Sequence, residues 1–91
     1  MELRWTIKAI SDLARLHEFL ALMNKSAAAR TVQSLTAAPT SLLKNPRIGE
    51  KLEEFEPREV RRILAGSYEI RYEIQKSTIY VLRFWHTRED R

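Results

Sequence analysis

Hydrophobic and polar positions change period early in the chain. Residues 2–7 alternate between polar and apolar, which predicts a short strand with one buried face. From residue 10 onward, apolar residues recur at spacings of three and four, which predicts an amphipathic helix over residues 10–23 with Ser11 or Asp12 serving its first turn. The positions that define this helical stripe are Ile10, Leu13, Leu16, Leu20 and Met23.

A second helix is predicted after a break at residues 24–26, which supplies a new N-cap. Its inner side is expected to carry small and aliphatic residues, namely Ala27, Ala28, Val32 and Leu35. Pro39 cannot donate an intrahelical hydrogen bond, so we expect this helix to end near Ala38. A short helical turn at Leu42 and Leu43 then precedes a loop at residues 45–49.

The pattern of the last third of the chain predicts β-strands. One strand is predicted from Val60 to Leu64 and a second, with regular alternation, from Tyr68 to Ile74. The segment from Thr78 to Trp85 is apolar on both predicted faces, with Ile79 and Val81 on one and Tyr80, Leu82 and Phe84 on the other. Such a strand is typically central, so we expect it to lie between the preceding strand and the N-terminal strand.

These elements define an α+β fold of the order β-α-α-β-β-β. A helical hairpin is expected to pack on one face of a mainly antiparallel four-stranded sheet. The chain has 91 residues, which favours a single domain spanning residues 1–91.

Composition excludes several classes of site. The chain has no cysteine and only two histidines, so disulfides are excluded and no metal site is expected. Two glycines are too few for a phosphate-binding glycine-rich loop, and we expect no cofactor. No apolar run is long enough to span a bilayer and no signal-peptide pattern opens the chain, so we expect a cytoplasmic protein without membrane contact.

The positive charge is mostly arginine. Lys and Arg together number 16 against 12 acidic residues, and 11 of the 16 are arginine. Arginine favours planar contacts with carboxylates or phosphates, which fits either a nucleic-acid surface or an acidic protein partner. The candidates on the predicted strands are Arg61, Arg62, Arg71 and Arg83, and the polar tail adds residues 86–91. For Arg71, which lies between Glu69 and Glu73, ordinary cross-strand ion pairing is the simpler interpretation.

In order and spacing, these segments resemble the RelE/ParE superfamily of bacterial toxins. The resemblance rests on the helical hairpin, the loop at residues 45–49, the opening Val60-Arg61-Arg62, the strand from Tyr68 to Ile74 and the closing run from Phe84 to Arg88. It implies a RelE/ParE-like fold and the toxin half of a type II toxin–antitoxin pair, neutralised by a cognate antitoxin.

The resemblance also helps to choose a target. RelE-like members cleave mRNA on the ribosome with strand cations and a catalytic residue near the C-terminus. Arg62 and Arg88 match two of these cations, but Val60 and Glu69 stand where two others are expected, and the catalytic tyrosine would lie beyond Arg91. His86 favours the RNase interpretation, because some RNase members of the superfamily have a catalytic histidine at about this place. The ending His86-Thr87-Arg88 is closer to that of ParE-like toxins, which inhibit DNA gyrase by stabilising its cleaved-DNA complex.

The leading interpretation is therefore a non-enzymatic gyrase inhibitor with no catalytic residues. Its expected target-binding residues are His86, Arg88, Arg91 and Arg62, and its expected antitoxin-binding residues are Trp5, Leu16 and Leu20. Its expected partners are a ParD-like antitoxin and DNA gyrase with DNA, with the DNA-cleaving subunit of gyrase as the expected contact. A ribosome-dependent mRNA endoribonuclease and a non-toxic antitoxin-binding member remain as alternatives. A homodimer and a toxin–antitoxin hetero-oligomer both stay open.

Overall fold

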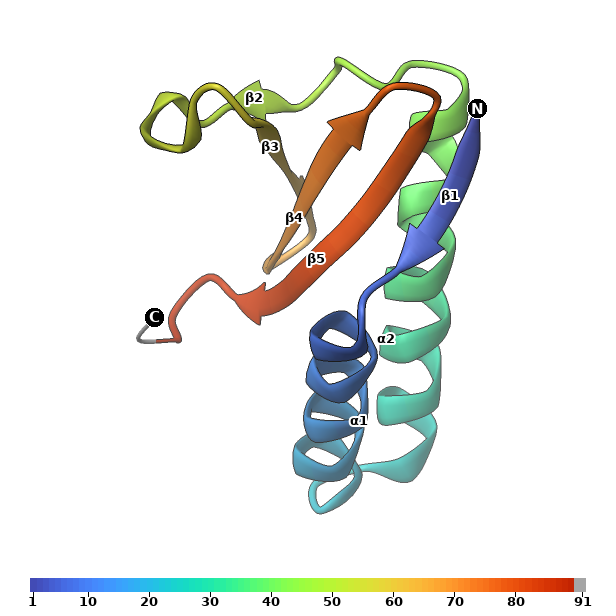
Figure 1. The fold of residues 1–91 in the computed structure, drawn as a ribbon. Helices are drawn as coiled ribbons and strands as arrows, with labels where there is room; N and C mark the ends of the chain where they lie inside the picture. Colours follow the sequence, from blue (N-terminus) through green and yellow to red (C-terminus); the bar gives the residue numbers. More distant parts are fainter. Residues whose placement is uncertain (90–91) are drawn as a thin grey trace.

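A helical hairpin and a twisted sheet make up the molecule (Figure 1). The computed structural model describes residues 1–89. The elements in chain order are β1 (Glu2–Trp5), α1 (Ile7–Ala21), α2 (Lys25–Ala37), the 3₁₀ turn η1 (Ala38–Leu43), β2 (Glu50–Lys51), the 3₁₀ turn η2 (Glu53–Phe55), β3 (Glu59–Ala65), β4 (Tyr68–Gln75) and β5 (Thr78–His86). No helix in this part of the chain is both long and apolar enough to cross a bilayer.

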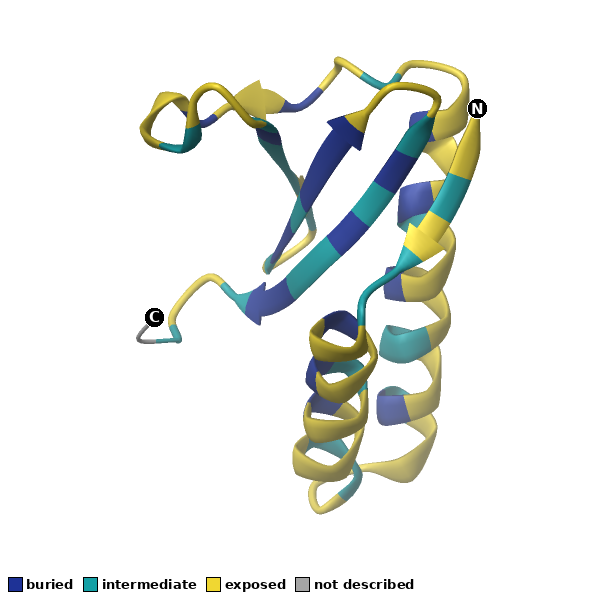
Figure 2. Cartoon of the chain, viewed as in Figure 1, coloured by how far each residue is buried: buried dark blue, intermediate teal, exposed yellow. Residues whose placement is uncertain are grey.

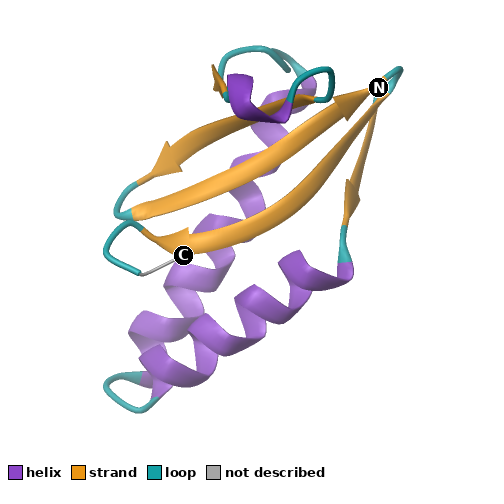
Figure 3. Ribbon diagram, turned by 60° about the vertical axis from the view of Figure 1, so that its left-hand side comes forward, coloured by secondary structure: helices purple, strands orange, loops and turns teal. Residues whose placement is uncertain are grey.

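The sheet has the strand order β1-β5-β4-β3-β2, with both helices on one face (Figure 3). The α+β class and the mainly antiparallel pairing are confirmed, since among the described strands only β1 and β5 run parallel. The central place of β5, between β4 and β1, is also confirmed. The expected number of strands was wrong: a fifth strand, β2, pairs with Arg61 and Arg62 of β3.

A bulge in β5 corrects the predicted faces of that strand. Tyr72 is paired with Val81 but Arg71 with Arg83, so the ladder between β4 and β5 skips Leu82. An extra residue of this kind shifts the alternation by one position. As a result Phe84, predicted to lie opposite Val81, is fully buried in the same core cluster as Val81.

The helices start earlier than their patterns predicted. The N-cap of α1 is Thr6, whose hydroxyl accepts a hydrogen bond from the Ala9 N–H at 3.1 Å, so the expected capping role of Ser11 or Asp12 was wrong. Helix α2 begins within the predicted break, with Asn24 as its cap, and ends just before Pro39. Its predicted inner residues are buried or half-buried.

The core-facing side of α1 differs from the predicted stripe. Ala9, Asp12 and Leu16 are its buried residues, whereas Ile10 and Met23 are 57% and 82% exposed. The far half of the hairpin extends beyond the sheet, where much of its surface is open to solvent (Figure 2). Phe19, Leu22 and Met23 lie in this exposed part.

The loop before β2 is anchored by a buried tyrosine. The Tyr72 hydroxyl donates to the Pro46 carbonyl at 2.7 Å and accepts from the Gly49 N–H at 3.0 Å. A β-carbon on Gly49 would lie 2.5 Å from the Tyr72 hydroxyl and 2.7 Å from the Arg62 carbonyl oxygen. This close approach explains why the position requires glycine.

We therefore expect Gly49→Ala to lower the free energy of unfolding by about 1–3 kcal/mol, because the loop must move to admit the methyl group. Urea unfolding followed by circular dichroism measures the effect. Gly66→Ala is the comparison, since its β-carbon would meet nothing within 4 Å and only the φ of +61° opposes it. A Gly49→Ala protein no less stable than the Gly66→Ala protein would contradict this role.

Candidate functional site

The chain folds back on itself directly after β5. The Thr87 N–H donates to the Ser67 carbonyl at 2.8 Å, which ties residues 86–89 to the turn between β3 and β4. Within this segment, the His86 N–H donates to the Glu89 carboxylate at 2.8 Å and the Arg88 N–H donates to His86 Nδ1 at 3.1 Å. These bonds fix the backbone of the segment, here called the C-terminal turn, and the Arg88 side chain remains exposed.

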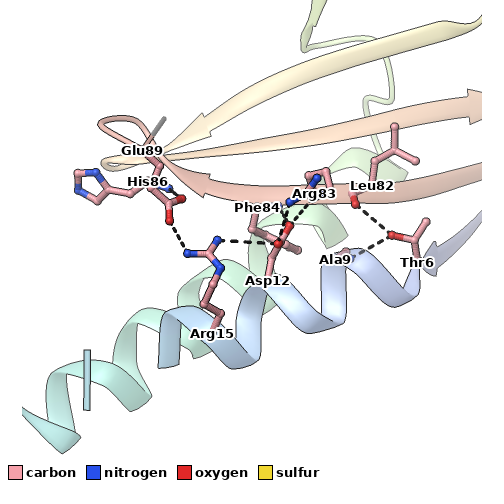
Figure 4. Close-up of polar contacts among 9 residues, drawn as sticks. All are labelled: Thr6, Ala9, Asp12, Arg15, Leu82, Arg83, Phe84, His86 and Glu89. Atoms are coloured by element: carbon pink, nitrogen blue, oxygen red, sulfur yellow. Dashed lines mark hydrogen bonds and ion pairs between the residues drawn. The ribbon is translucent and has the colours of Figure 1, made fainter. Parts of the chain in front are cut away.

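Helix α1 holds the C-terminal turn through Arg15 (Figure 4). Arg15 forms an ion pair with Glu89, and its other terminal nitrogen lies 3.8 Å from the Asp12 carboxylate. Asp12 in turn accepts bonds from Arg83 Nε at 2.7 Å and from the Phe84 N–H at 3.0 Å. A continuous polar chain therefore links the middle of α1 to the end of β5.

Asp12 also completes an edge of the sheet. The pairing of β1 with β5 ends at Trp5 and Val81, and Thr6 adds a bond from its hydroxyl to the Leu82 carbonyl. Beyond the end of β1, the Asp12 carboxylate accepts the bond from the Phe84 N–H in place of a strand carbonyl. Helix α1 thus covers the part of the β5 edge that β1 leaves open.

A pocket of about 560 Å³ lies between the C-terminal turn and α1. Its apolar lining comes from Leu16, Phe19, Leu20 and Tyr68, and its charged rim from Arg15, His86, Arg88 and Glu89. The Tyr68 and His86 rings meet edge to face with centroids 5.2 Å apart, and burial raises the pKa of Tyr68. An apolar floor with a few charged groups at the rim suits a partner side chain that is apolar with a polar end.

Ion pairs hold three carboxylates in their charged form. The hydrogen bond from Arg58 lowers the pKa of Glu73, and the hydrogen bond from Arg47 lowers that of Glu59. Burial alone would raise the pKa of Glu89, but its bonds from Arg15 and from the His86 N–H outweigh burial and lower it. All three groups therefore favour the folded state when ionised.

From these directions we expect the free energy of unfolding to fall in acid. A carboxyl whose pKa is lower folded than unfolded contributes its stability above the unfolded value of about 4.3, and loses it as the pH drops through the folded value. Urea unfolding from neutral pH to below about pH 4 measures this loss. Glu73→Gln is expected to flatten the acid limb, and an unchanged limb in that variant would contradict the assignment.

The structure brings four of the predicted site residues together. His86 and Arg88, predicted to bind the target, line the same pocket as Leu16 and Leu20, predicted to bind the antitoxin. Leu16 is only 4% exposed and contributes mainly to the core.

Two of the other predicted site residues, Trp5 and Arg62, do not join this pocket. Trp5 packs on the core with its ring stacked on Phe84 at 5.2 Å. Arg62 lies in the same cross-strand row as Arg71 and Arg83, whereas His86 is paired with Tyr68 at the end of the sheet. Arg62 bonds to Glu50 at 2.9 Å and to Glu69 at 3.4 Å. Arg91 lies outside the described residues.

Arg15, Phe19 and Tyr68 of this pocket were not among the candidate site residues, and Glu89 was included only as part of the polar tail. Arg15, Phe19 and Glu89 fall in polar or mixed stretches without a motif. Arg15 and Glu89 are 74 positions apart, so no local spacing marks them as partners. The available signal was Phe19, an aromatic residue beside the predicted helical stripe, which the structure shows to be exposed.

A helical hairpin on one face of a mainly antiparallel sheet is also found in a solved structure. That structure is described as "Chromosomal ParDE TA system from P. aeruginosa", and one of its chains matches this one with a TM-score of 0.78 and 22% identity. The match covers 94% of this chain and 95% of the other. It shows a shared fold.

The sequence itself identifies the family. The family model described as "ParE toxin of type II toxin-antitoxin system, parDE" matches residues 3–91. The chain therefore belongs to the ParE toxin family. A search of curated proteins returned no match.

Proposed function

We propose that this ParE-family chain inhibits DNA gyrase by stabilising the cleaved DNA–gyrase complex, so that replication stops. Family membership over residues 3–91 is the observation that carries the proposal. In the proposed mode, His86 and Arg88 on the C-terminal turn make the contact with the gyrase–DNA assembly. The C-terminal turn is fixed by the three hydrogen bonds described above and by one from the Glu89 N–H to the His86 carbonyl at 2.9 Å. An exposed arginine on such a turn can bind an anionic group with little loss of side-chain and backbone freedom.

We further propose that the chain acts by binding and not by cleaving RNA. RelE-like RNases are expected to have an arginine directly after the residue that corresponds to Tyr68, and Glu69 occupies that position here. Glu69 is 1% exposed and takes bonds from Arg62 and from Arg71 at 3.2 Å. A carboxylate thus stands where the RNase would have an arginine, and it pairs with Arg62, one of the two residues that match the RNase cations.

A ParD-like antitoxin is the proposed neutralising partner. We place its apolar contact at the pocket that contains Leu16 and Leu20, together with the edge strand β1, which ends at Trp5. The exposed Phe19 continues this apolar surface toward the tip of the hairpin. An antitoxin segment seated there would cover His86 and Arg88, so antitoxin and gyrase would compete for the same pocket.

Pulse labelling after induced expression tests the proposed target in cells. Thymidine incorporation is expected to stop before amino-acid incorporation, because a trapped gyrase complex blocks replication while existing mRNA is still translated. The reverse order would reject the gyrase proposal in favour of a ribosome-dependent RNase. Unaffected growth and incorporation at verified expression would favour the non-toxic member.

A further inference from the structure

The sheet face opposite the helical hairpin carries a row of arginines. Ile70, Tyr72 and Ile74 of β4 pack toward the helices, so the alternating Glu69, Arg71 and Glu73 lie on the other face. In the cross-strand register, Arg71 lies between Arg62 of β3 and Arg83 of β5. Like charges directly opposite one another destabilise a sheet, so this row needs either compensation or a function.

Buried carboxylates compensate the row but leave its outer surface cationic. The side chain of Arg58 is 54% exposed against 6% for its partner Glu73. The corresponding values are 34% and 7% for Arg83 and Asp12, and 19% and 1% for Arg71 and Glu69. In these three pairs the anion is inside and the cation outside, so the charge presented to solvent around Arg58, Arg71 and Arg83 is positive. Arg62, at the other end of the row, differs because its partner Glu50 is itself exposed.

The arginines keep unused donors. Arg58 and Arg83 each bind their carboxylate through Nε and Nη2, which leaves Nη1 without a hydrogen-bond acceptor among residues 1–89. Arg71 binds Glu69 through Nη2; its Nε also has no acceptor in the same part of the chain, but it is buried and does not face an external ligand. A guanidinium engaged on one edge can still donate to an anion from its other edge.

Aromatic rings hold these guanidinium groups in place. The Arg71 guanidinium lies 4.6 Å from the centroid of the Trp85 ring and 5.3 Å from that of Phe55. Arg83 also stacks on Trp85 at 4.9 Å, and Arg58 lies 6.0 Å from Phe55. Side chains fixed in this way lose less conformational entropy when a ligand binds.

Together these groups line a second pocket, of about 340 Å³, which we call the arginine–aromatic pocket. Its defining residues are Lys8, Phe55, Arg58, Arg71, Arg83 and Trp85. Lys8 comes from the first turn of α1, and within the described chain no carboxylate lines the pocket. The pocket therefore collects cations from a helix, a loop and two strands.

We infer that the arginine–aromatic pocket binds the phosphodiester backbone of DNA. Planar guanidinium groups match phosphate oxygens with paired hydrogen bonds, and backbone contacts position a protein on DNA without reading its sequence. Within the proposed function, on which the identity of this DNA rests, the pocket contacts the strand held by gyrase while the C-terminal turn contacts the enzyme. The pocket is a second contact, distinct from that containing His86 and Arg88.

Binding of a short fluorescein-labelled DNA duplex to the full chain, measured by fluorescence anisotropy over a salt series, tests this inference. Lys8→Glu is expected to weaken binding about tenfold near 0.1 M salt and to reduce the slope of log K against log salt by about 1. Lys25→Glu is the matched control, because Lys25 also lies in the first turn of a helix and is exposed. The control is expected to change binding less than about twofold.

A second variant tests the geometry of the pocket. Arg71→Lys keeps the positive charge beside Glu69 but removes the stacked planar group, and we expect about three- to tenfold weaker DNA binding. Circular dichroism and urea unfolding verify that each variant is folded. Equal losses for Lys8→Glu and Lys25→Glu, absence of DNA binding by the parent chain, or equally strong competition by poly-glutamate would each overturn the inference.

The DNA-binding test of the arginine–aromatic pocket and the test of gyrase as the target can fail independently of each other. Gyrase inhibition without a specific effect of Lys8→Glu on DNA binding would leave the proposed function standing and remove this site. Specific DNA binding at the pocket without gyrase inhibition would keep the site and remove gyrase as the target.

Discussion

Purified protein with Arg88→Ala is expected to inhibit gyrase supercoiling at least about tenfold more weakly than the parent chain. Arg88 is exposed on the C-terminal turn and lies at the rim of the pocket between that turn and α1, here called the larger pocket because its volume exceeds that of the arginine–aromatic pocket. A hydrogen bond to a charged group contributes about 1.5–3 kcal/mol, and about 1.4 kcal/mol corresponds to a factor of ten. A concentration series of toxin against a fixed amount of gyrase measures the change.

Arg30→Ala is the matched control for Arg88→Ala. Arg30 is an exposed arginine on α2, outside the larger pocket, and its replacement removes the same charge. Both variants are expected to unfold within about 0.5 kcal/mol of the parent chain, because each changes an exposed side chain. Equal inhibition by the two variants would contradict a specific role of Arg88.

Replacing Asp12 by alanine is expected to lower the free energy of unfolding by about 3 kcal/mol. The Asp12 side chain is 7% exposed and accepts bonds from Arg83 and from the Phe84 N–H. Its removal leaves a buried N–H without an acceptor and a guanidinium without its counter-ion, and both cost free energy. For a domain of this size we expect the melting temperature to fall by more than about 10 °C.

Glu18→Ala provides the comparison on the same helix, since Glu18 is exposed and makes no ion pair with any residue of the described chain. Thermal and urea unfolding of the two variants separate the buried acid from a general effect of charge on α1. An Asp12→Ala protein as stable as the Glu18→Ala protein would show that the polar chain from α1 to β5 contributes little.

The strands of the last third could be predicted closely from sequence because their patterns are local. Regular alternation from Tyr68 and the turn at residues 75–77 fix β4 and β5 to within a residue of their predicted ends. Strand β2 could not be predicted, because it has two exposed residues and no pattern of its own. The bulge at Leu82 could not be predicted either, because an extra residue does not change the hydrophobic pattern of a strand that is apolar on both faces.

The core-facing side of α1 was harder to predict for an energetic reason. A charged residue is expected at the surface unless it is paired, and the partners of Asp12 lie more than 70 positions away on β5. The pocket between the C-terminal turn and α1 was hard to predict for a similar reason, because some of its residues are far apart in sequence. His86 and Arg88 could be singled out from their position after the last strand, but Arg15 and Glu89 become neighbours only when α1 packs against the end of the sheet.

The most direct test of the central claim is a cleavage assay with purified gyrase, relaxed plasmid, ATP and a concentration series of this chain. The proposed function predicts loss of supercoiling together with linear plasmid after detergent and protease treatment, because a trapped gyrase complex holds a double-strand break. Unchanged supercoiling and no linear DNA at an excess of folded toxin over gyrase would contradict it.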